Sequence, residues 1–392
     1  MIEFRSYVAD LHTHIGRTRL GAAVKITAAP SLTLQSIIRY AVEIKGIDMV
    51  GVIDCHVEEV LKELDEDIEN GEAVPLIGGG IRYPGVTLLL GTEIELFDEN
   101  CQGPVHVLCY LPTIESMKEF SLWLAKRMKN PSLSSQRIYE NAKILQMKVK
   151  ELSGLFIPAH VFTPFKSLYG KGVTRSLTEV FDPALIDAIE LGLSSDTIMA
   201  DQLEELHQYS FLTNSDAHSL EKMAREYQIV RMNCPSFEEL KLALSQLRGR
   251  NIIGNYGLNP LLGKYYRTIC AKCSMQIDGK RCTQCGSTKV IKGVFERLRE
   301  LASRRSVQIE RPPYIHQVPL EFIPKLGKKT IQKLRKYFGT DMSIIHDVSE
   351  EELIKVVQPS IAKAILAARE GTISIKAGGG GVYGKIERNN NS

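Results

Sequence analysis

Short apolar runs recur along the first half of the chain, and each one leads into residues that can bind a metal ion. Such runs, bounded by turn residues, are typical of buried strands. The runs and the residues that follow them are Tyr7–Ala9 before His12 and His14, Met49–Ile53 before Asp54 and His56, Val86–Thr92 before Glu93, Pro104–Val105 before His106, Leu155–Ala159 before His160, and Phe211–Ser215 before Asp216 and His218. An α/β barrel builds its site from the carboxyl ends of several strands, so the pattern predicts a metal centre at one end of such a barrel.

The first of these segments is Asp10-Leu-His-Thr-His14. Side chains at positions i and i+2 of a strand point to the same side, so the two imidazoles can converge on one ion. Because a His-x-His pair also occurs by chance, the repetition of the pattern carries the prediction. Six of the nine histidines fall in the series.

Helical periodicity fills the spaces between the apolar runs, as in Leu32–Lys45, which Gly46 should end. Alternation of strand and helix favours parallel βα units. The segments 86–96 and 104–111 are different, because only a short polar stretch separates them. They predict a hairpin that places Glu93 close to His106.

Composition and charge change this picture in the last third of the chain. Residues 263–392 hold 24 Lys and Arg against 12 Asp and Glu, a net charge of +12, whereas residues 1–262 have a net charge of −9. A basic region attached to an acidic one suggests a polyanionic partner, although a solvated basic surface explains it equally well. With no apolar stretch long enough for a membrane span and no signal-peptide pattern, we expect a cytoplasmic protein.

Four of the eight cysteines form two pairs, Cys270-x-x-Cys273 and Cys282-x-x-Cys285. Each pair directs two thiolates at one ion, and together they complete a tetrahedral, closed zinc site. We therefore predict a structural Zn²⁺ in a reducing compartment. The element either presents nucleic-acid contacts or serves as a staple between domains, and both roles are compatible.

Basic residues interleaved with aromatic ones are the candidates for nucleic-acid contacts. The loop after His160 holds Lys166, Tyr169 and Lys171, with Phe165 as a second aromatic candidate, and an ordinary long loop is the alternative. The zinc element adds Tyr265, Tyr266 and Arg267, together with Lys264, Lys272, Lys280 and Arg281.

The C-terminal region contains a segment, 322–334, that resembles a helix-hairpin-helix, in which backbone N–H groups bind a DNA phosphate. Lys328 and Lys329 are its candidate contacts. That motif expects glycine where Lys325 stands, and a structural helical hairpin is the alternative. The glycine-rich stretch 378–384 would permit close approach to DNA or to another protein segment. Residues 387–392 look disordered.

The motif series DLHTH, VIDCH, GTEIE, PVH, PAH and NSDAH resembles, in this order, that of the PHP superfamily of metal-dependent phosphoesterases. The resemblance implies a distorted (β/α)7 barrel. It implies that His12, His14, Glu93 and Asp216 surround one ion and that Glu93 bridges to a second ion held by His106 and His160. Asp54 or His56, with His218, would hold a third; Cys55 separates these two residues, where the family has Asp-His, so the ligand stays open.

We therefore expect two to three catalytic divalent ions, Zn²⁺, Mn²⁺ or Mg²⁺, with Fe also suited to such ligands. Asp10 and Asp196 are the candidate catalytic carboxylates. Capping of the following helix is the alternative role of Asp196.

Over nearly its full length the chain resembles the endonuclease Q family: a barrel over 1–262, a zinc element over 263–292 and a basic helical region over 293–392. That resemblance implies cleavage of DNA 5′ to uracil, hypoxanthine, xanthine or an abasic site, leaving 3′-hydroxyl and 5′-phosphate ends, with other repair proteins as candidate partners. Two alternatives remain, a phosphatase of the histidinol-phosphate type and a non-catalytic DNA-binding protein. The first needs no basic tail, and the intact ligand series argues against the second.

Overall fold

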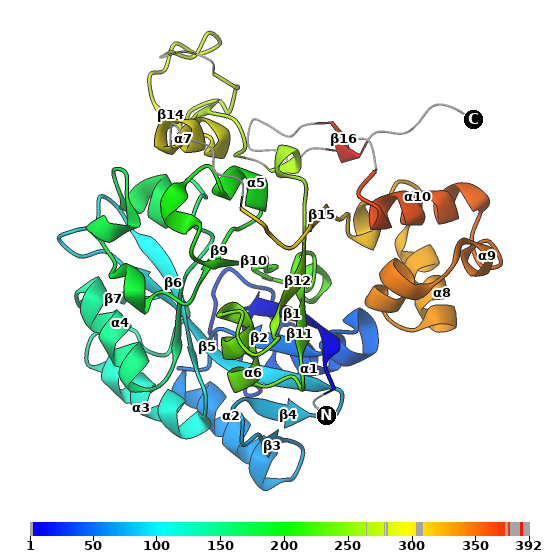
Figure 1. The fold of residues 1–392 in the computed structure, drawn as a ribbon, viewed down its shortest axis with the longest axis horizontal. Coiled ribbons are helices and arrows are strands. Elements are labelled where there is room, and N and C mark those ends of the chain that lie inside the picture. Colours follow the sequence, from blue (N-terminus) through cyan, green and yellow to red (C-terminus); the bar gives the residue numbers. More distant parts are fainter. Residues whose placement is uncertain are drawn as a thin grey trace.

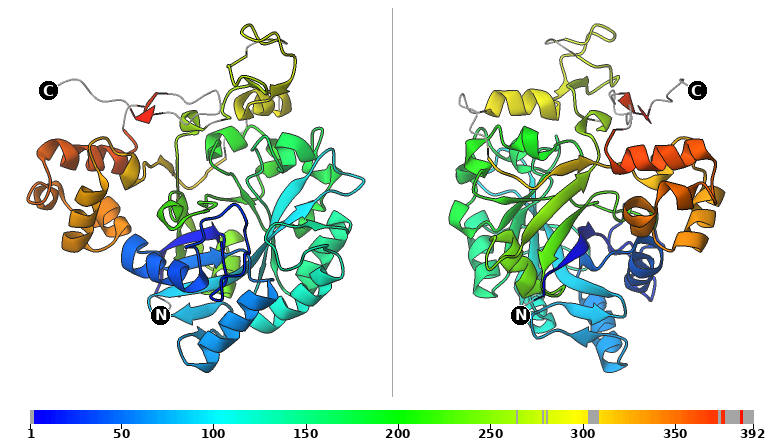
Figure 2. Two further views of the ribbon diagram at one scale, coloured as in Figure 1. Left: turned by 180° about the vertical axis from the view of Figure 1, so that it is seen from behind. Right: turned by 45° about the vertical axis from the view of Figure 1, so that its right-hand side comes forward.

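A computed structural model of the chain describes residues 3–372, apart from 264, 278, 280 and 303–308, and the backbone of 375–376 and 385–386. The glycine-rich stretch 378–384, the tail 387–392, Lys264 and Lys280 lie outside the described residues. Figures 1 and 2 show a central sheet wrapped by helices, with the segment around β14 and α7 projecting at one end and helices α8 to α10 on one side.

The central sheet is mixed and has eleven strands, in the order β15-β12-β11-β1-β2-β5-β4-β3, with β6 joining β5 to β8 and β7 added to β5. The strands are β1 Arg5–Thr13, β2 Met49–Val52, β3 Val74–Pro75, β4 Ile81–Tyr83, β5 Val86–Leu96, β6 Val105–Leu111, β7 Arg137–Ile138, β8 Leu155–Pro158, β11 Tyr227–Met232, β12 Asn251–Gly257 and β15 Tyr314–His316. Three two-stranded ladders stand apart, β9 Ala188–Glu190 with β10 Ser210–Leu212, β13 Ile269–Cys270 with β14 Val290–Ile291, and β16 Ile375–Lys376 with β17 Lys385–Ile386.

The α/β class is confirmed, but the pairing departs from a regular barrel. The neighbours β1, β2 and β5 run parallel, as predicted for βα units, whereas β1–β11, β5–β6 and β6–β8 are antiparallel. The predicted hairpin is β5–β6, in which Glu95 faces His106 and Glu93 faces Leu108. Within the described residues the ladder does not close, because β9 and β10 pair only with each other.

Helices cover the outside of the sheet, and the predicted helix after the first motif begins at a capping box on Thr33. It ends at Gly46, whose φ of 76° is the left-handed conformation that glycine adopts most easily. The helices are α1 Leu34–Tyr40, α2 Glu58–Glu69, α3 Ile114–Ala125, α4 Ala142–Glu151, α5 Thr197–Ala200, α6 Phe237–Leu244, α7 Val294–Leu301, α8 Lys328–Phe338, α9 Glu350–Leu353 and α10 Pro359–Arg369. Single 3₁₀ or π turns are η1 Ala41–Lys45, η2 Leu168–Gly172, η3 Leu177–Glu179, η4 Pro183–Leu185, η5 Glu204–Leu206, η6 Leu220–Lys222, η7 Pro260–Leu262, η8 Leu320–Phe322 and η9 Ser343–Asp347.

The C-terminal region packs on the sheet through both a strand and a buried ion pair. Strand β15 adds to β12 in parallel, and its neighbour Gln317 accepts a hydrogen bond from the Tyr227 hydroxyl. Lys45, at the end of the first helix, lies 3.1 Å from Asp341, which also binds Arg335. Apolar residues of α8 and α10 therefore share one core with those of the N-terminal part. The boundaries 1–262, 263–292 and 293–392 stay a prediction.

Among the described helices, none combines the length and the apolar character needed to cross a lipid bilayer.

Candidate metal centre and substrate cavity

The strand ends bring imidazole and carboxylate groups together at one end of the sheet. His12 lies in β1 with His14 just beyond it, Glu93 lies in β5 and His106 in β6. His160 follows β8, and Asp216 and His218 follow β10. Because side chains at i and i+2 share one side of a strand, the rings of His12 and His14 lie 5.4 Å apart.

The first ligand group consists of His12, His14 and Asp216, whose donor atoms all lie within 4.8 Å of one another. Asp216 Oδ1 is 3.4 Å from His12 Nε2 and 3.5 Å from His14 Nε2. Both imidazole Nε2 atoms are buried and have no hydrogen-bond partner among the described residues. Buried polar atoms are costly unless they are satisfied, so two unpaired imidazole nitrogens that face a carboxylate fit a bound cation.

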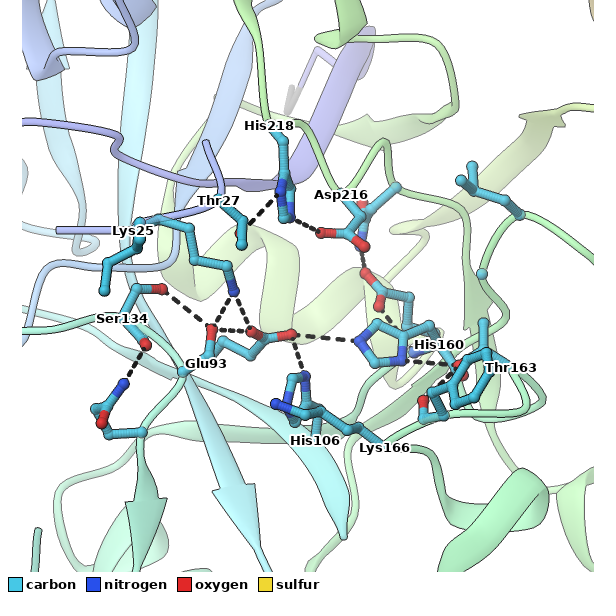
Figure 3. A pocket seen from close by; sticks show the side chains of 18 of the residues that line it. Lys25, Thr27, Glu93, His106, Ser134, His160, Thr163, Lys166, Asp216 and His218 are labelled. Carbon is cyan, nitrogen blue, oxygen red and sulfur yellow. Dashed lines mark hydrogen bonds and ion pairs between the residues drawn. The ribbon is translucent and has the colours of Figure 1, made fainter. Parts of the chain in front are cut away.

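The second ligand group consists of Glu93, His106 and His160, and dashed lines in Figure 3 join the Glu93 carboxylate to both imidazoles. Glu93 Oε1 is 2.8 Å from His106 Nδ1 and 3.2 Å from His160 Nε2. The same carboxylate lies 3.7 Å from both His12 Nε2 and His14 Nε2. Its position between the two groups is the one that the resemblance implies for a bridging ligand.

The pKa shifts of the ligand residues indicate a site that attracts positive charge. Burial raises the pKa of the Asp216 and Glu93 carboxyls, but the neighbouring histidines hold both well below their usual values. Burial lowers the pKa of His12, yet Glu190, Asp216 and Glu93 raise it to about 10. The buried carboxylates stay ionised, and their negative charge is strong enough to hold a proton on a buried imidazole. A bound metal ion can supply that positive charge in place of the proton.

Glu190 is the residue that sequence reasoning missed. It ends β9, and its Oε1 accepts hydrogen bonds from His12 Nδ1 at 2.9 Å and from Asn214 Nδ2 at 2.8 Å. Its Oε2 accepts one from the backbone N–H of His160 at 2.9 Å. Metal-binding histidines usually donate their second N–H to a carboxylate in this way. The signal available in the sequence is the acidic end of a short apolar strand, Ala188–Glu190.

The third predicted ion, held by Asp54 or His56 with His218, stays a prediction, because Asp54 Oδ1 and His56 Nε2 are buried without a hydrogen-bond partner among the described residues but do not form one ligand group with His218. Asp54 lies behind His14, 3.2 Å from its Nδ1, and accepts the backbone N–H of Ile15 at 2.7 Å. The Nδ1 atom of His56 pairs with Thr92 Oγ1 at 2.7 Å, away from both groups. His218 lies beside the first group instead, 3.4 Å from Asp216.

The two candidate catalytic carboxylates, Asp10 and Asp196, lie outside the cavity that opens above the ligand groups. This corrects their assignment as catalytic residues. Asp10 is fully buried and accepts backbone N–H groups of Ser215 at 3.1 Å and Ala224 at 2.7 Å. It therefore fixes the loop that carries Asp216. Asp196 caps α5 by accepting from Met199 N, and its other oxygen lies 3.2 Å from His316 Nε2.

Above the two ligand groups lies a cavity of about 490 Å³. The loop 17–31 holds three basic residues, Arg17, Arg19 and Lys25, and of these only Lys25 lines the cavity. Arg17 donates to Gly21 O instead, and Arg19 pairs with Asp67. Lys25 Nζ donates to Glu93 Oε2 at 3.3 Å. Lys166 lines the cavity as well and lies 2.8 Å from Glu95.

Tyr169 is not available for base stacking, which corrects another prediction. Its side chain is fully buried, lies 5.3 Å from the Phe162 ring, and donates its hydroxyl to Glu205 at 2.8 Å. Lys171 is exposed in the same turn but does not line the cavity. The aromatic residues that do line the cavity are Phe165, the second predicted candidate, and Tyr265.

The four cysteines of the predicted zinc element converge. Cys270, Cys273, Cys282 and Cys285 place their sulfur atoms within 4.8 Å of one another, with Cys270–Cys285 at 3.5 Å and Cys273–Cys282 at 3.4 Å. Hydrogen bonds from backbone N–H groups lower the pKa of the Cys270 and Cys282 thiols, whereas hydrogen bonding among the neighbouring sulfur atoms raises the pKa of Cys273. Sulfur atoms this close together, with thiolates favoured at two positions, fit a shared zinc ion.

The remaining predicted DNA contacts differ in their surroundings. Tyr266 packs against Phe295 with ring centroids 5.5 Å apart, and Arg267 binds Glu296 at 2.6 Å. Lys328 and Lys329 are exposed in the first turn of α8. The preceding Lys325 has a φ of 68°, so this turn takes the left-handed conformation although it has lysine where glycine is expected.

Clustered imidazole and carboxylate groups at the floor of a cavity suit the hydrolysis of esters with bound divalent ions, so the chain combines an α/β fold with the candidate site of a metal-dependent hydrolase. Similarity to a solved structure then identifies the family within this class of hydrolases. The lesion-specific endonuclease PfuEndoQ from Pyrococcus furiosus superposes with a TM-score of 0.84 at 31% identity, over 98% of this chain and 95% of that chain. The chain belongs to the endonuclease Q family.

Two further relatives cover nearly the whole chain. A structure of endonuclease Q with a 27-mer duplex that carries an abasic lesion at the active site also has a TM-score of 0.84, with 30% identity over 98% of this chain and 97% of that chain. The uncharacterized protein YqxK of Bacillus subtilis is 56% identical over 381 residues, 97% of this chain and 98% of that protein. No protein-family profile matches the chain.

Proposed function

We propose that this protein is a DNA-repair endonuclease that hydrolyses the phosphodiester bond 5′ to a deaminated base (uracil, hypoxanthine or xanthine) or to an abasic site, leaving 3′-hydroxyl and 5′-phosphate ends. The observation that carries the proposal is the pair of ligand groups joined by Glu93 beneath the cavity, in a chain that resembles two endonuclease Q structures over 98% of its length.

His12, His14 and Asp216 would hold one ion, His106 and His160 a second, and Glu93 would bridge them. Divalent ions held there lower the pKa of a bound water and neutralise the charge that develops on the phosphate. The ligand types suit Zn²⁺, Mn²⁺ or Fe, and the four-cysteine cluster suits a structural Zn²⁺.

The protein groups around these ligands perform the remaining tasks. Glu190 orients His12 and supports the backbone at His160. Lys25 and Lys166 stand beside Glu93 and Glu95, where their ammonium groups can exchange a carboxylate for a phosphate oxygen of the entering strand. The exposed Lys328 and Lys329 at the start of α8 suit a backbone phosphate farther along the duplex.

A direct test incubates the protein with end-labelled duplexes that contain a single uracil, hypoxanthine, xanthine or abasic analogue, beside an undamaged duplex and a phosphomonoester. Each reaction is run with Mn²⁺, Zn²⁺ or Mg²⁺ and with a chelator. We expect one metal-dependent cut, 5′ to the lesion, whose 3′-hydroxyl and 5′-phosphate ends DNA ligase can rejoin in the uracil duplex.

The two alternative functions give different results in the same assay. Hydrolysis of the phosphomonoester alone would identify a small-molecule phosphatase. Binding of lesion DNA without any cut, in a protein that has bound its metals, would identify a non-catalytic DNA-binding protein.

A further inference from the structure

One face of strand β5 leads from the metal centre to the outer surface of the molecule. Glu93, Glu95 and Phe97 alternate along β5 and the residue after it, so their side chains share one side. Glu93 lies among the ligands, Glu95 pairs with Lys166 at the cavity, and Phe97 is 36% exposed. At a rise of about 3.3 Å per residue, Phe97 stands about 13 Å beyond Glu93. A polymer that leaves the cavity along this face therefore meets Phe97 and its neighbours.

Strand β7 lies beside this end of β5 and adds two cations and a second aromatic ring. Arg137 pairs in register with Glu95, and its guanidinium lies 4.6 Å from the centre of the Phe97 ring and 5.3 Å from that of the Tyr139 ring. The Lys129 ammonium also lies 5.3 Å from the centre of the Tyr139 ring. These four residues, Phe97, Lys129, Arg137 and Tyr139, form a cation–aromatic strip.

The protein holds the two cations of the strip without neutralising them. Among the described residues neither Arg137 nor Lys129 forms an ion pair with a carboxylate, and Arg137 Nε is buried without a hydrogen-bond partner. The acid next in sequence to the strip, Asp98, accepts the backbone N–H of Ala142 at 2.9 Å instead. An aromatic face attracts a cation but leaves its charge uncancelled, and two like charges around one ring repel each other. An anion beside both cations is therefore favoured.

We infer that the cation–aromatic strip binds the sugar–phosphate backbone of the DNA strand that is cut, outside the cavity. Arg137 and Lys129 each contact a phosphate, and the two rings hold these cations in place. This inference rests on the proposed function. A DNA strand carries one charge per ~3.4 Å, so a distance of about 13 Å corresponds to about four phosphates from the metal centre. Figure 1 shows β7 and α8 on opposite flanks of the central sheet, so the strip anchors the duplex on the side away from α8.

The experiment measures two quantities with the metal-loaded full-length protein. Fluorescence anisotropy gives the affinity for an undamaged duplex over a salt series, and cleavage kinetics give kcat and KM for a duplex with one uracil. In Arg137→Ala and in Lys129→Ala, the slope of log affinity against log salt should become shallower by about 0.9, the value for one lost phosphate contact. At about 0.1 M salt KM should rise about five- to tenfold with kcat unchanged. Arg137→Lys keeps the charge and should keep the wild-type slope.

Shortened duplexes locate the contact along the strand. The uracil duplex is cut back, from one end or from the other, to about two base pairs from the cleaved bond. The difference in KM between Arg137→Ala and the wild type should vanish on the duplex that no longer reaches the strip. It should persist when the opposite arm is shortened.

Arg231→Ala is the matched control. The Arg231 guanidinium also lies over an aromatic ring, 5.0 Å from the centre of Phe4, but its strand pairs there with the start of β1, whereas the metal ligands lie at the end of β1. This variant loses the same charge and should keep the wild-type slope and KM. Thermal unfolding confirms that each variant is folded.

Three results would overturn the inference: wild-type slope and KM in both alanine variants, an equal loss in Arg231→Ala, or a difference in KM that persists on both shortened duplexes. Failure of the wild-type protein to cut the uracil duplex would overturn the proposed function instead. The anisotropy series needs no cleavage, so it would still show whether the strip binds DNA.

Discussion

Replacement of Glu190 by Gln tests how the two ligand groups are held, because this carboxylate lies outside both groups yet contacts each. Three donors share its two oxygens, His12 Nδ1, Asn214 Nδ2 and the backbone N–H of His160. Glutamine keeps the shape of the side chain but has only one carbonyl oxygen. Whichever way the amide is turned, its NH₂ group faces at least one of these donors, and the negative charge opposite His12 is lost.

The expected loss of metal affinity can be worked out from the donor that is left without an acceptor. A buried donor left without an acceptor costs about 1–3 kcal/mol, more when its bond was to a charged group. Loss of such an outer partner of a metal-binding histidine typically weakens metal binding by about 10–100-fold, which is about 1.4–2.7 kcal/mol. The two figures agree, so we expect the concentration of Mn²⁺ that gives half-maximal activity to rise by about 10–100-fold in Glu190→Gln.

The assay is a metal titration of cleavage with calorimetric binding in parallel, and saturating metal should restore most of the wild-type rate. Glu205→Gln is the matched control, because Glu205 also accepts several hydrogen bonds, from Tyr169 and Ser176, but lies away from the cavity. If Glu190→Gln binds and uses metal at wild-type concentrations, or if Glu205→Gln shifts the titration equally, then Glu190 does not hold the two ligand groups in place.

Three further predictions address the ligands, the zinc element and pH. His12→Ala and Asp216→Ala should each abolish cleavage while leaving DNA binding, followed by fluorescence anisotropy, near the wild-type affinity; near-normal metal-dependent cleavage in both variants would contradict the assignment. Cys270→Ser should lose a zinc equivalent by elemental analysis and expose residues 265–290 to proteolysis, since such elements fold with their metal. Burial raises the pKa of Glu226 from 4.5 to about 8, against the opposing effects of the Leu258 backbone N–H and of Arg225, so the folded state binds this proton more tightly than the unfolded state does. That stabilisation is complete below pH 4.5 and is lost as pH rises through 8, so between pH 6 and 9 the wild type should lose about 3 kcal/mol more unfolding free energy than Glu226→Gln in urea titrations.

Local sequence patterns were sufficient to predict the strands and most of the candidate metal ligands. The apolar runs are the strands β1, β2, β5, β6, β8 and β10, and the short polar stretch after β5 makes its antiparallel pairing with β6 predictable. The antiparallel pairing of β11 with β1 and the addition of β15 to the sheet could not be foreseen in this way. Both join segments that are far apart in sequence, and the apolar pattern of a strand does not specify which neighbour it pairs with.

The mistaken assignments at the site have one physical cause, which is that side-chain surroundings depend on tertiary packing. Tyr169 and Phe165 look alike in the sequence, yet η2 turns the tyrosine into the core and leaves the phenylalanine exposed. Asp10 lies within a strand and Asp216 shortly after one, but only the Asp216 carboxylate lies beside histidine side chains. Glu190 belongs to a strand of three residues, and its partners come from β1 and from the loops after β8 and β10.

Backbone strain is concentrated among the residues that line the cavity. Ten non-glycine residues have positive φ in the described part of the chain, and four of them line the cavity: Ser135, His160, Lys166 and Asp216. Each such residue typically costs about 1–3 kcal/mol and persists only when its surroundings enforce it.

The enforcing contacts run between the two ligand groups. Glu190 accepts the backbone N–H of His160 and also orients His12, and Ala217, the residue after Asp216, pairs with the backbone of His12 and His14. A Cβ atom at Gly192 would lie 2.8 Å from the Cβ of His160, so glycine is required where the chain passes this strained residue. Because the strained position of each group is held by residues that also position the other group, displacement of one group should weaken metal binding at both.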